Sequence, residues 1–215
     1  STNKFTVIGS SSNDQFVWSG STSPYFTNID GGVGNDVFNF STSTTGKTVN
    51  LYDSLYSNIE VVIGSAAGDT LRGTGSTNET LSGAAGSDVL WGGDGSSSDS
   101  LNGGAGADTF WFGINQGEDT IYGNTGNDAK SDVVRLNGIN FADLTFGASG
   151  ADASIGFKAS TGVIGNLALE GFANLSSDFA NRVNTFVTDD LTFGLAIANA
   201  TGAALNSSSL SDYLQ

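Results

Sequence analysis

Acidic residues recur at a nearly constant spacing through the middle of the chain. The tighter of two series has steps of 19 or 20 residues, and its acids end glycine-rich hexapeptides such as GAAGSD and GGAGAD. The members of this tight series are Asp69, Asp88, Asp108 and Asp128. A looser series, in turns with more serine and threonine, comprises Glu79, Asp99 and Asp119. Carboxylates repeated in this way are ligands for a hard cation, provided that the fold brings successive members together.

The glycines beside these acids add further oxygen ligands. Turns of the form GGxGxD let the backbone adopt positive φ and aim carbonyl oxygens at one point beside the carboxylate. The chain has no His and no Cys to form a zinc, copper or iron site, and about six to eight oxygens from two neighbouring turns suit Ca²⁺. We therefore expect several Ca²⁺ ions. The candidate ligands are Gly31, Val33, Asp36, Gly64, Ala66, Asp69, Glu79, Gly83, Ala85, Asp88, Asp99, Gly103, Ala105, Asp108, Asp119, Gly123, Thr125 and Asp128.

Short strands must position these ligands. Every acid of both series except Asp128 is followed two positions later by an apolar residue, and these are Leu71, Leu81, Leu90, Leu101, Phe110 and Ile121. A period near 20 that divides into two halves, each a turn and a three-residue strand, predicts a solenoid with two strands per coil. Stacked strands lie about 4.8 Å apart. Carboxylates at that spacing repel by roughly 3 kcal/mol per pair at an effective dielectric near 20, so the coils need cations between them.

The full repeats resemble a known family. GGVGNDVFN, GAAGSDVLW and GGAGADTFW are similar to the nonapeptide GGxGxDxUx of the repeats-in-toxin (RTX) calcium-binding proteins. This resemblance covers roughly the first two thirds of the chain and implies an all-β fold, a right-handed parallel β-roll. RTX proteins leave bacteria by type I secretion through an uncleaved C-terminal signal, so the resemblance also implies a secreted, extracellular or cell-surface location. The ending SSSLSDYLQ resembles such a signal or is a frayed terminus.

The repeats divide the chain into two parts. Residues 1–136 are expected to form the calcium-binding roll, irregular at 18–30 and 40–63, with Asp14 of a degenerate first repeat facing Asp36. Residues 137–215 lack the motif but contain short apolar blocks separated by Gly and Asn, and we expect a β-rich C-terminal cap, with or without a secretion signal. Such a flank covers the open strand edges of the last coil.

Composition excludes several functions. A formal charge of −15 argues against nucleic acid or an anionic membrane as a partner, and no stretch approaches the roughly 20 apolar residues of a membrane span. The absence of His and Cys excludes a Ser-His-Asp triad, a thiol nucleophile and an imidazole base. We therefore predict that the chain is not an enzyme.

Two function classes remain. The chain is a calcium-dependent structural or assembly module of a bacterial surface protein, such as an S-layer subunit or an adhesin, or it is the C-terminal secretion and stability module of an RTX exoenzyme, such as a protease, lipase or alginate epimerase. Besides calcium, the partners considered are other copies of the chain and a cell-surface polysaccharide.

A further pattern concerns the outer face of the roll. Strand alternation points Arg72, Trp91, Trp111 and Arg135 outward, one on each successive strand, as a ladder. We expect the C-terminal strands to fold back over this ladder; the alternative is a docking surface for a neighbouring subunit or a glycan.

Overall fold

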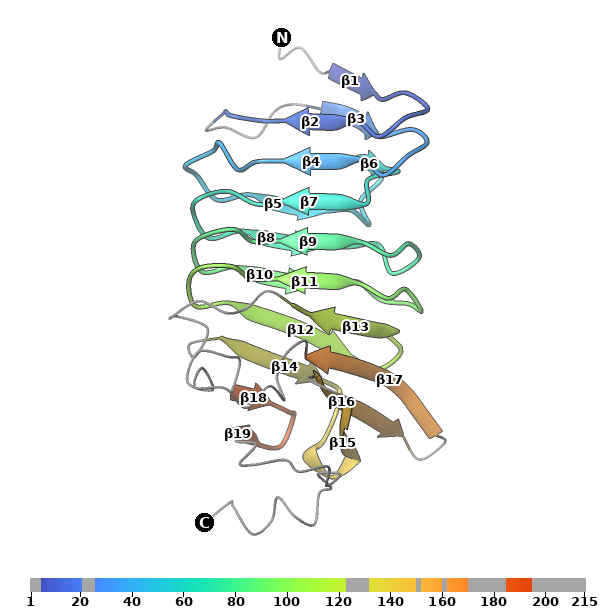
Figure 1. The fold of residues 1–215 in the computed structure, drawn as a ribbon, viewed down its shortest axis with the longest axis vertical. Helices are drawn as coiled ribbons and strands as arrows, with labels where there is room; N and C mark the ends of the chain where they lie inside the picture. The colour runs from blue at the N-terminus through green and yellow to red at the C-terminus, as the bar shows by residue number, and fades with distance from the viewer. Residues whose placement is uncertain are drawn as a thin grey trace.

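The described part of the chain consists of β-strands joined by turns. The computed structural model describes residues 5–20, 26–122, 132–149, 152–159, 162–169 and 185–194. Among these residues the only helical element is a 3-10 helix, η2 (Phe141–Asp143). Most strands stack as rungs along the long axis of the molecule (Figure 1). The protein is an all-β parallel solenoid, and none of its described residues forms a helix long and apolar enough to cross a membrane.

Two long sheets form the walls of the solenoid. One has seven strands in the spatial order β19 (Thr192–Gly194), β18 (Thr185–Val187), β14 (Val133–Asn137), β12 (Thr109–Gly113), β10 (Val89–Trp91), β8 (Thr70–Arg72) and β5 (Thr48–Asn50). The other has nine, in the order β15 (Leu144–Ser149), β16 (Asp152–Ala159), β17 (Gly162–Leu169), β13 (Glu118–Ile121), β11 (Ser100–Asn102), β9 (Thr80–Ser82), β7 (Val61–Ile63), β4 (Val37–Asn39) and β2 (Gln15–Val17). A smaller sheet joins β1 (Phe5–Ile8), β3 (Phe26–Asp30) and β6 (Tyr56–Ser57).

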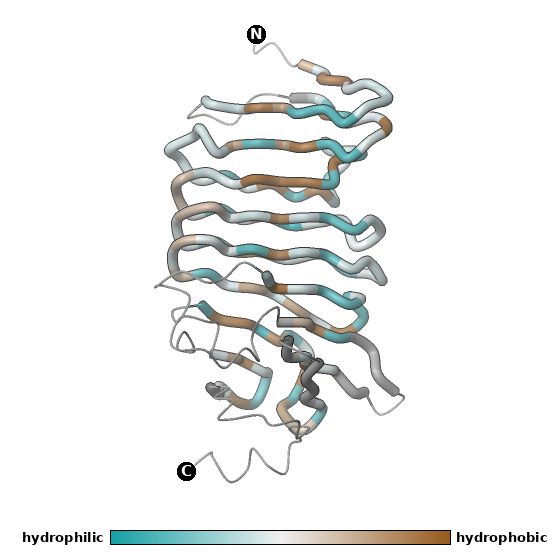
Figure 2. The backbone as a smooth tube through the Cα atoms, viewed as in Figure 1, coloured by the Kyte–Doolittle hydropathy of each residue, from teal (hydrophilic) through white to brown (hydrophobic). Residues whose placement is uncertain are grey.

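The three-residue strands are short because each contributes one inward side chain between two turns. In the seven-stranded sheet the paired inward residues are Val49, Leu71, Leu90, Phe110, Val134 and Phe186, all buried. In the facing sheet they are Phe38, Val62, Leu81, Leu101 and Ile121, also buried. Hydrophobic segments accordingly lie along the strands in Figure 2. All six apolar positions predicted from the repeat lie in this core, which stacks in two columns.

The C-terminal strands extend both sheets. β17 pairs in parallel with β13, and β18 pairs in parallel with β14, while β16, β15 and β19 continue as antiparallel neighbours. They therefore cover the strand edges of the last coil. The expectation that they fold back over the ladder is wrong for the described strands, since Trp111 remains 37% exposed. Edge pairing satisfies the backbone groups of β13 and β14, which packing over the face would leave open.

Candidate metal sites

The turns before the seven-stranded sheet carry a column of carboxylates. Strand pairing aligns the residues that directly precede β5, β8, β10, β12 and β14, and these are Lys47, Asp69, Asp88, Asp108 and Asp132. The backbone N–H of each residue donates to Oδ1 of the next, over 2.5 to 2.9 Å. All five residues are buried. The carboxylates of this tight column thus link successive coils.

A second column lies before the nine-stranded sheet. It contains Asp14, Asp36, Glu60, Glu79, Asp99 and Asp119, each of which precedes its inward apolar residue by two positions. The N–H of Asp14 donates to Asp36 Oδ1 over 2.7 Å, so the predicted pairing of these two acids is confirmed. Further links run from Asp36 N to Glu60 Oε2, from Glu79 N to Asp99 Oδ1 and from Asp99 N to Asp119 Oδ1. The looser series therefore belongs to a longer loose column, which begins at Asp14.

Sequence spacing did not identify two members. Glu60 follows Asp36 by 24 residues and Asp132 follows Asp108 by 24, so both fall outside the 20-residue period. Asp132 takes the register position after Asp108 for which Asp128 was predicted. Asp128, Gly123 and Thr125 lie outside the described residues. The signal that locates Glu60 and Asp132 is the strand that follows each, IEVVI and DVVRL.

The first glycine of each turn makes room for the carboxylate that ends the turn. A Cβ at Gly64 would fall on Asp69 Oδ2 and on the carbonyl oxygen of Gly83 in the next turn. The same holds at Gly83, where a Cβ would meet Asp88 Oδ2 and the carbonyl oxygen of Gly103. Gly31 and Gly103 likewise lie against Oδ2 of Asp36 and Asp108. The cradles at Gly31, Gly64 and Gly83 each bring a carboxylate oxygen and a carbonyl oxygen of the adjacent coil to one point, which is the ligand chemistry of Ca²⁺.

The carboxylate oxygens that face the first glycine, Oδ2, differ from turn to turn in their hydrogen-bond donors. In the turns with serine at the second position, Ser10 and Ser65 donate both N–H and hydroxyl groups to Oδ2 of Asp14 and Asp69. Where glycine or alanine holds that position, Oδ2 of Asp36 and of Asp88 is buried and has no hydrogen-bond donor among the described residues.

Glu79 shows the same arrangement with a different pair of donors. Its Oε1 accepts hydrogen bonds from the hydroxyls of Thr74 and Thr77, while Oε2 is buried without a donor in the described structure. A buried carboxylate oxygen without a donor is costly, and a bound cation removes that cost. The turns therefore fit a calcium ion.

The third position of each turn points its side chain away from the roll. Val33 is 71% exposed, and Ala66 and Ala105 are also exposed. The N–H groups of Val33, Ala66, Ala85 and Ala105 donate to carbonyls of the preceding turn, which keeps the turns in register. The Ala105 carbonyl itself accepts a hydrogen bond from Gly86 N. No three carboxylates of the described residues converge on one point, so a bound ion would draw on carbonyl oxygens as well.

Burial makes these carboxylates reluctant to ionise. It raises the pKa of Asp88 from 3.8 to about 7, helped by the negative charges of Asp108 and Asp69. Burial likewise raises the pKa of Glu79 from 4.5 to about 7, of Asp119 from 3.8 to about 7 and of Asp99 from 3.8 to about 6. In the absence of bound cations, the carboxylates of both columns therefore take up protons near neutral pH.

Lys47 begins the tight column in place of an acid. Its side chain is 6% exposed, and the ammonium donates to the carbonyl oxygen of Gly20 and to Thr45 Oγ1 over 3.2 and 2.8 Å. Gly20 belongs to the segment after β2, and Thr45 to the turn before β5. The Lys47 ammonium group thus bridges oxygens of two segments at the end of the tight column.

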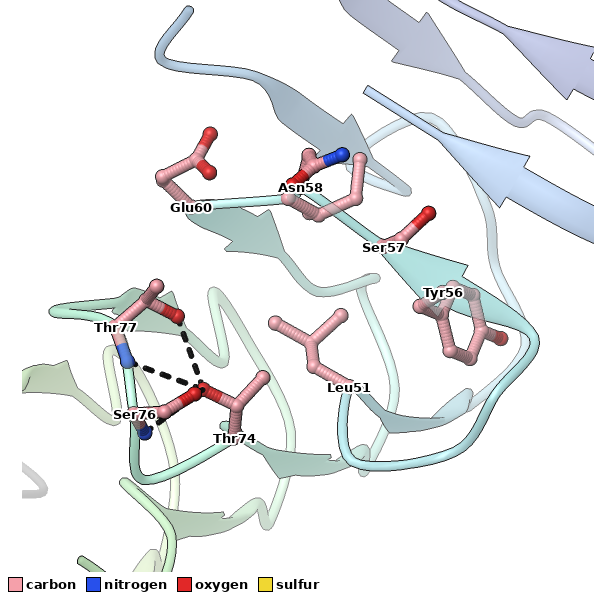
Figure 3. Close-up of a pocket in the computed structure, with 9 residues that line it drawn as sticks. Leu51, Tyr56, Ser57, Asn58, Glu60, Thr74, Ser76 and Thr77 are labelled. Carbon is pink, nitrogen blue, oxygen red and sulfur yellow. Dashed lines mark hydrogen bonds between the residues drawn. The ribbon is translucent and has the colours of Figure 1, made fainter. Parts of the chain in front are cut away.

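A small cavity interrupts the loose column. Between β6 and β7 the connection is only residues 58–60, and beside it lies a space of about 170 Å³ (Figure 3). Its lining residues are Leu51, Tyr56, Ser57, Asn58, Ile59, Glu60, Thr74, Ser76 and Thr77. Thr74 Oγ1 is bonded there to Ser76 and Thr77. Glu60 is the one column member that lines this cavity, where a full turn is missing.

Comparison with known proteins identifies a family of repeats in this part of the chain. The family model of the RTX calcium-binding nonapeptide repeat (4 copies) matches residues 73–109, 95–114 and 115–129. No curated protein matches the chain. Among solved structures, the AlgE6R3 subunit of the mannuronan C5-epimerase from Azotobacter vinelandii is 21% identical, with a TM-score of 0.39, over 81% of this chain and 93% of that chain. RTX nonapeptide repeats bind Ca²⁺ at several sites, and residues 73–129 are an array of these repeats.

Proposed function

We propose that the chain is a calcium-dependent structural module of a secreted bacterial surface protein, of the S-layer or adhesin kind, which folds when it meets calcium outside the cell. The observation that carries this proposal is the set of buried carboxylate oxygens without donors, at Asp36, Glu79 and Asp88. These oxygens belong to turns of neighbouring coils, so the sites they form do not exist in the unfolded chain. Calcium binding then contributes directly to the free energy of folding.

The same columns support a structural role for the chain, without catalysis. Each link uses one carboxylate oxygen to hold the backbone of the preceding coil, as from Asp88 N to Asp108 Oδ1. The other oxygen lies in the turn, against the first glycine. Both oxygens are thus committed to stacking the coils, and the result is a rigid, extended piece suited to assembly.

Calcium dependence of the fold tests the proposal. Far-UV circular dichroism in EDTA is expected to show loss of strand signal, which returns at about 10⁻⁴–10⁻³ M calcium, the affinity range of extracellular modules. Magnesium at the same concentration is the control and is expected to fold the chain less well, because it demands a small octahedral site and releases water reluctantly. Equal strand content in EDTA and in millimolar calcium would overturn the proposal.

A further inference from the structure

The outer face of the seven-stranded sheet carries a row of aromatic rings and guanidinium groups. Arg72, Trp91, Trp111 and Arg135 are consecutive partners on β8, β10, β12 and β14. The Arg72 guanidinium lies 3.9 Å from the Trp91 ring centre and 5.3 Å from that of Tyr52, and Arg135 lies 5.9 Å from the Trp111 ring. We name these five residues the aromatic ladder. Cation–π contacts hold its rings in fixed orientations.

The aromatic ladder is open to solvent at Tyr52, Trp111 and Arg135, whereas Arg72 and Trp91 between them are half-buried. Tyr52 is 68% exposed, Trp111 is 37% exposed, and Arg135 is exposed as well. The described C-terminal strands pair at the sheet edges and leave Trp111 on this face exposed. Exposed large rings in a row mark a surface for a partner more often than scattered apolar residues do.

Charge narrows the choice of partner. The aromatic ladder contains no acid, and the nearby carboxylate of Asp94 is paired with Arg72 over 2.8 Å. No ion pair is formed by Arg135 within the described structure. A polyanion would therefore find one unpaired cation here, on a chain of formal charge −15, and a second copy would bring the same excess of negative charge. A neutral partner avoids both costs.

The spacing of the ladder residues further restricts the kind of partner that fits. Rungs about 4.8 Å apart present ring, ring and guanidinium at regular steps along the solenoid axis, which suits a partner that is itself a linear repeat. Pyranose rings stack their C–H faces on indoles, and their hydroxyls accept hydrogen bonds from guanidinium groups. We propose that the aromatic ladder is a docking surface for a neutral, linear polysaccharide that runs along the solenoid axis. This inference goes beyond the proposed function and requires only a folded roll.

Calorimetric titration of the full chain in millimolar calcium tests the inference. The probes are cellohexaose and mannohexaose, both neutral, and an oligogalacturonate as the anionic comparison. Both Trp111→Ala and Arg135→Ala are expected to weaken neutral-saccharide binding by about tenfold or more, the scale of a lost stacking contact. Phe5→Ala, which removes an exposed ring on β1, is the matched control and is expected to bind like the parent.

Circular dichroism of each sample separates the two proposals. A missing calcium response contradicts the proposed function, whereas a folded protein that binds neither neutral saccharide overturns the docking inference. Unchanged binding in Trp111→Ala would overturn it too, as would binding of the oligogalacturonate alone. The inference also fails if sedimentation velocity shows a dimer that Trp111→Ala dissociates, because the surface would then join two copies.

Discussion

Asp69 and Asp88 occupy equivalent places in the tight column, yet their Oδ2 atoms differ in hydrogen-bond donors. Ser65 donates two hydrogen bonds to Asp69 Oδ2, whereas Asp88 Oδ2 has no donor among the described residues. We predict that Asp88→Asn weakens calcium binding roughly tenfold more than Asp69→Asn, because hydrogen bonds to a charged group are worth about 1.5–3 kcal/mol and serine already supplies them to Asp69. Calcium midpoints from circular dichroism of the two variants measure the difference.

The calcium-free state supplies the control for this pair. Asp88→Asn removes a buried charge and is expected to retain more strand signal in EDTA than the parent does, while Asp69→Asn disturbs an acceptor that serine already satisfies and is expected to retain no more than the parent. A larger loss of calcium affinity in Asp69→Asn would mean that the serine turns are the stronger sites.

Lys47 offers a test by gain of a site. Its ammonium bridges Gly20 and Thr45, and its backbone N–H donates to Asp69 Oδ1 as an aspartate would in the same register. We predict that Lys47→Asp raises the number of bound calcium ions by about one, since it adds a carboxylate to the start of the tight column. Calorimetric stoichiometry measures the change. Arg135→Asp, at an exposed position on β14, makes the same change of charge outside the columns, and an equal gain there would refute the prediction.

At the scale of the turn, the first and third positions impose opposite demands. A Cβ at Gly103 would fall on Asp108 Oδ2, whereas the third position points outward and accommodates Val33 in the turn before β4. We predict that Gly103→Ala destabilises the calcium-bound protein by about 1–3 kcal/mol, the range for overpacking, and that Ala105→Val in the same turn changes stability by less than about 0.5 kcal/mol. Thermal unfolding in calcium measures both. Equal losses of stability in the two variants would show that the space left by Gly103 is not needed for the carboxylate.

The carboxylate columns also predict a pH dependence of the calcium-free protein. Burial raises the pKa of Asp88 and Asp119 from 3.8 to about 7, so the fold holds these protons more tightly than the unfolded chain does. Their stabilising protonation is fully present below pH ~4 and is lost as the pH rises to about 7. In EDTA the strand signal in far-UV circular dichroism is therefore expected to be larger at pH 4.5 than at pH 7.5, because protons then remove the buried charges that calcium otherwise neutralises.

In calcium the dependence is expected to reverse, because protons compete with the metal for the same oxygens. An equal strand signal in EDTA at pH 4.5 and at pH 7.5 would mean that protonation of these carboxylates does not stabilise the fold.

At the scale of strands and turns, the sequence predicted the register of the regular coils well and that of the irregular coils poorly. From Asp69 to Asp108 the repeat spacing, the strand period and the buried apolar residues agree, so position along the chain translates directly into register. Glu60 and Asp132 were missed because loop length changes before each, and register there depends on which strands pair. Lys47 was missed because a residue of opposite charge gives no signal in an acidic repeat.

For the whole molecule, the sequence predicted a β-rich flank that covers the strand edges of the last coil, and the described strands do so, but they do not also fold back over the ladder. The short C-terminal blocks do form strands, β15 to β19. Apolar content alone does not distinguish a strand that packs over a face from one that pairs at an edge. That choice depends on the unpaired backbone groups of β13 and β14, which are a property of the folded roll.

The last prediction follows from edge pairing. In a chain that ends at Asn137, β13 and β14 lose β17 and β18, so the backbone edges beside Ile121 and Val134 are exposed. We expect this truncation to raise the calcium midpoint and to cause aggregation that light scattering detects. The emission maximum of the tryptophans is expected to stay unchanged, because β17 and β18 pair with the edges of β13 and β14 and leave Trp111 exposed. A chain that ends at Gly194 keeps both edge strands and is the control. A red-shifted emission in the shorter chain, without aggregation, would show that the C-terminal part shields the aromatic ladder after all.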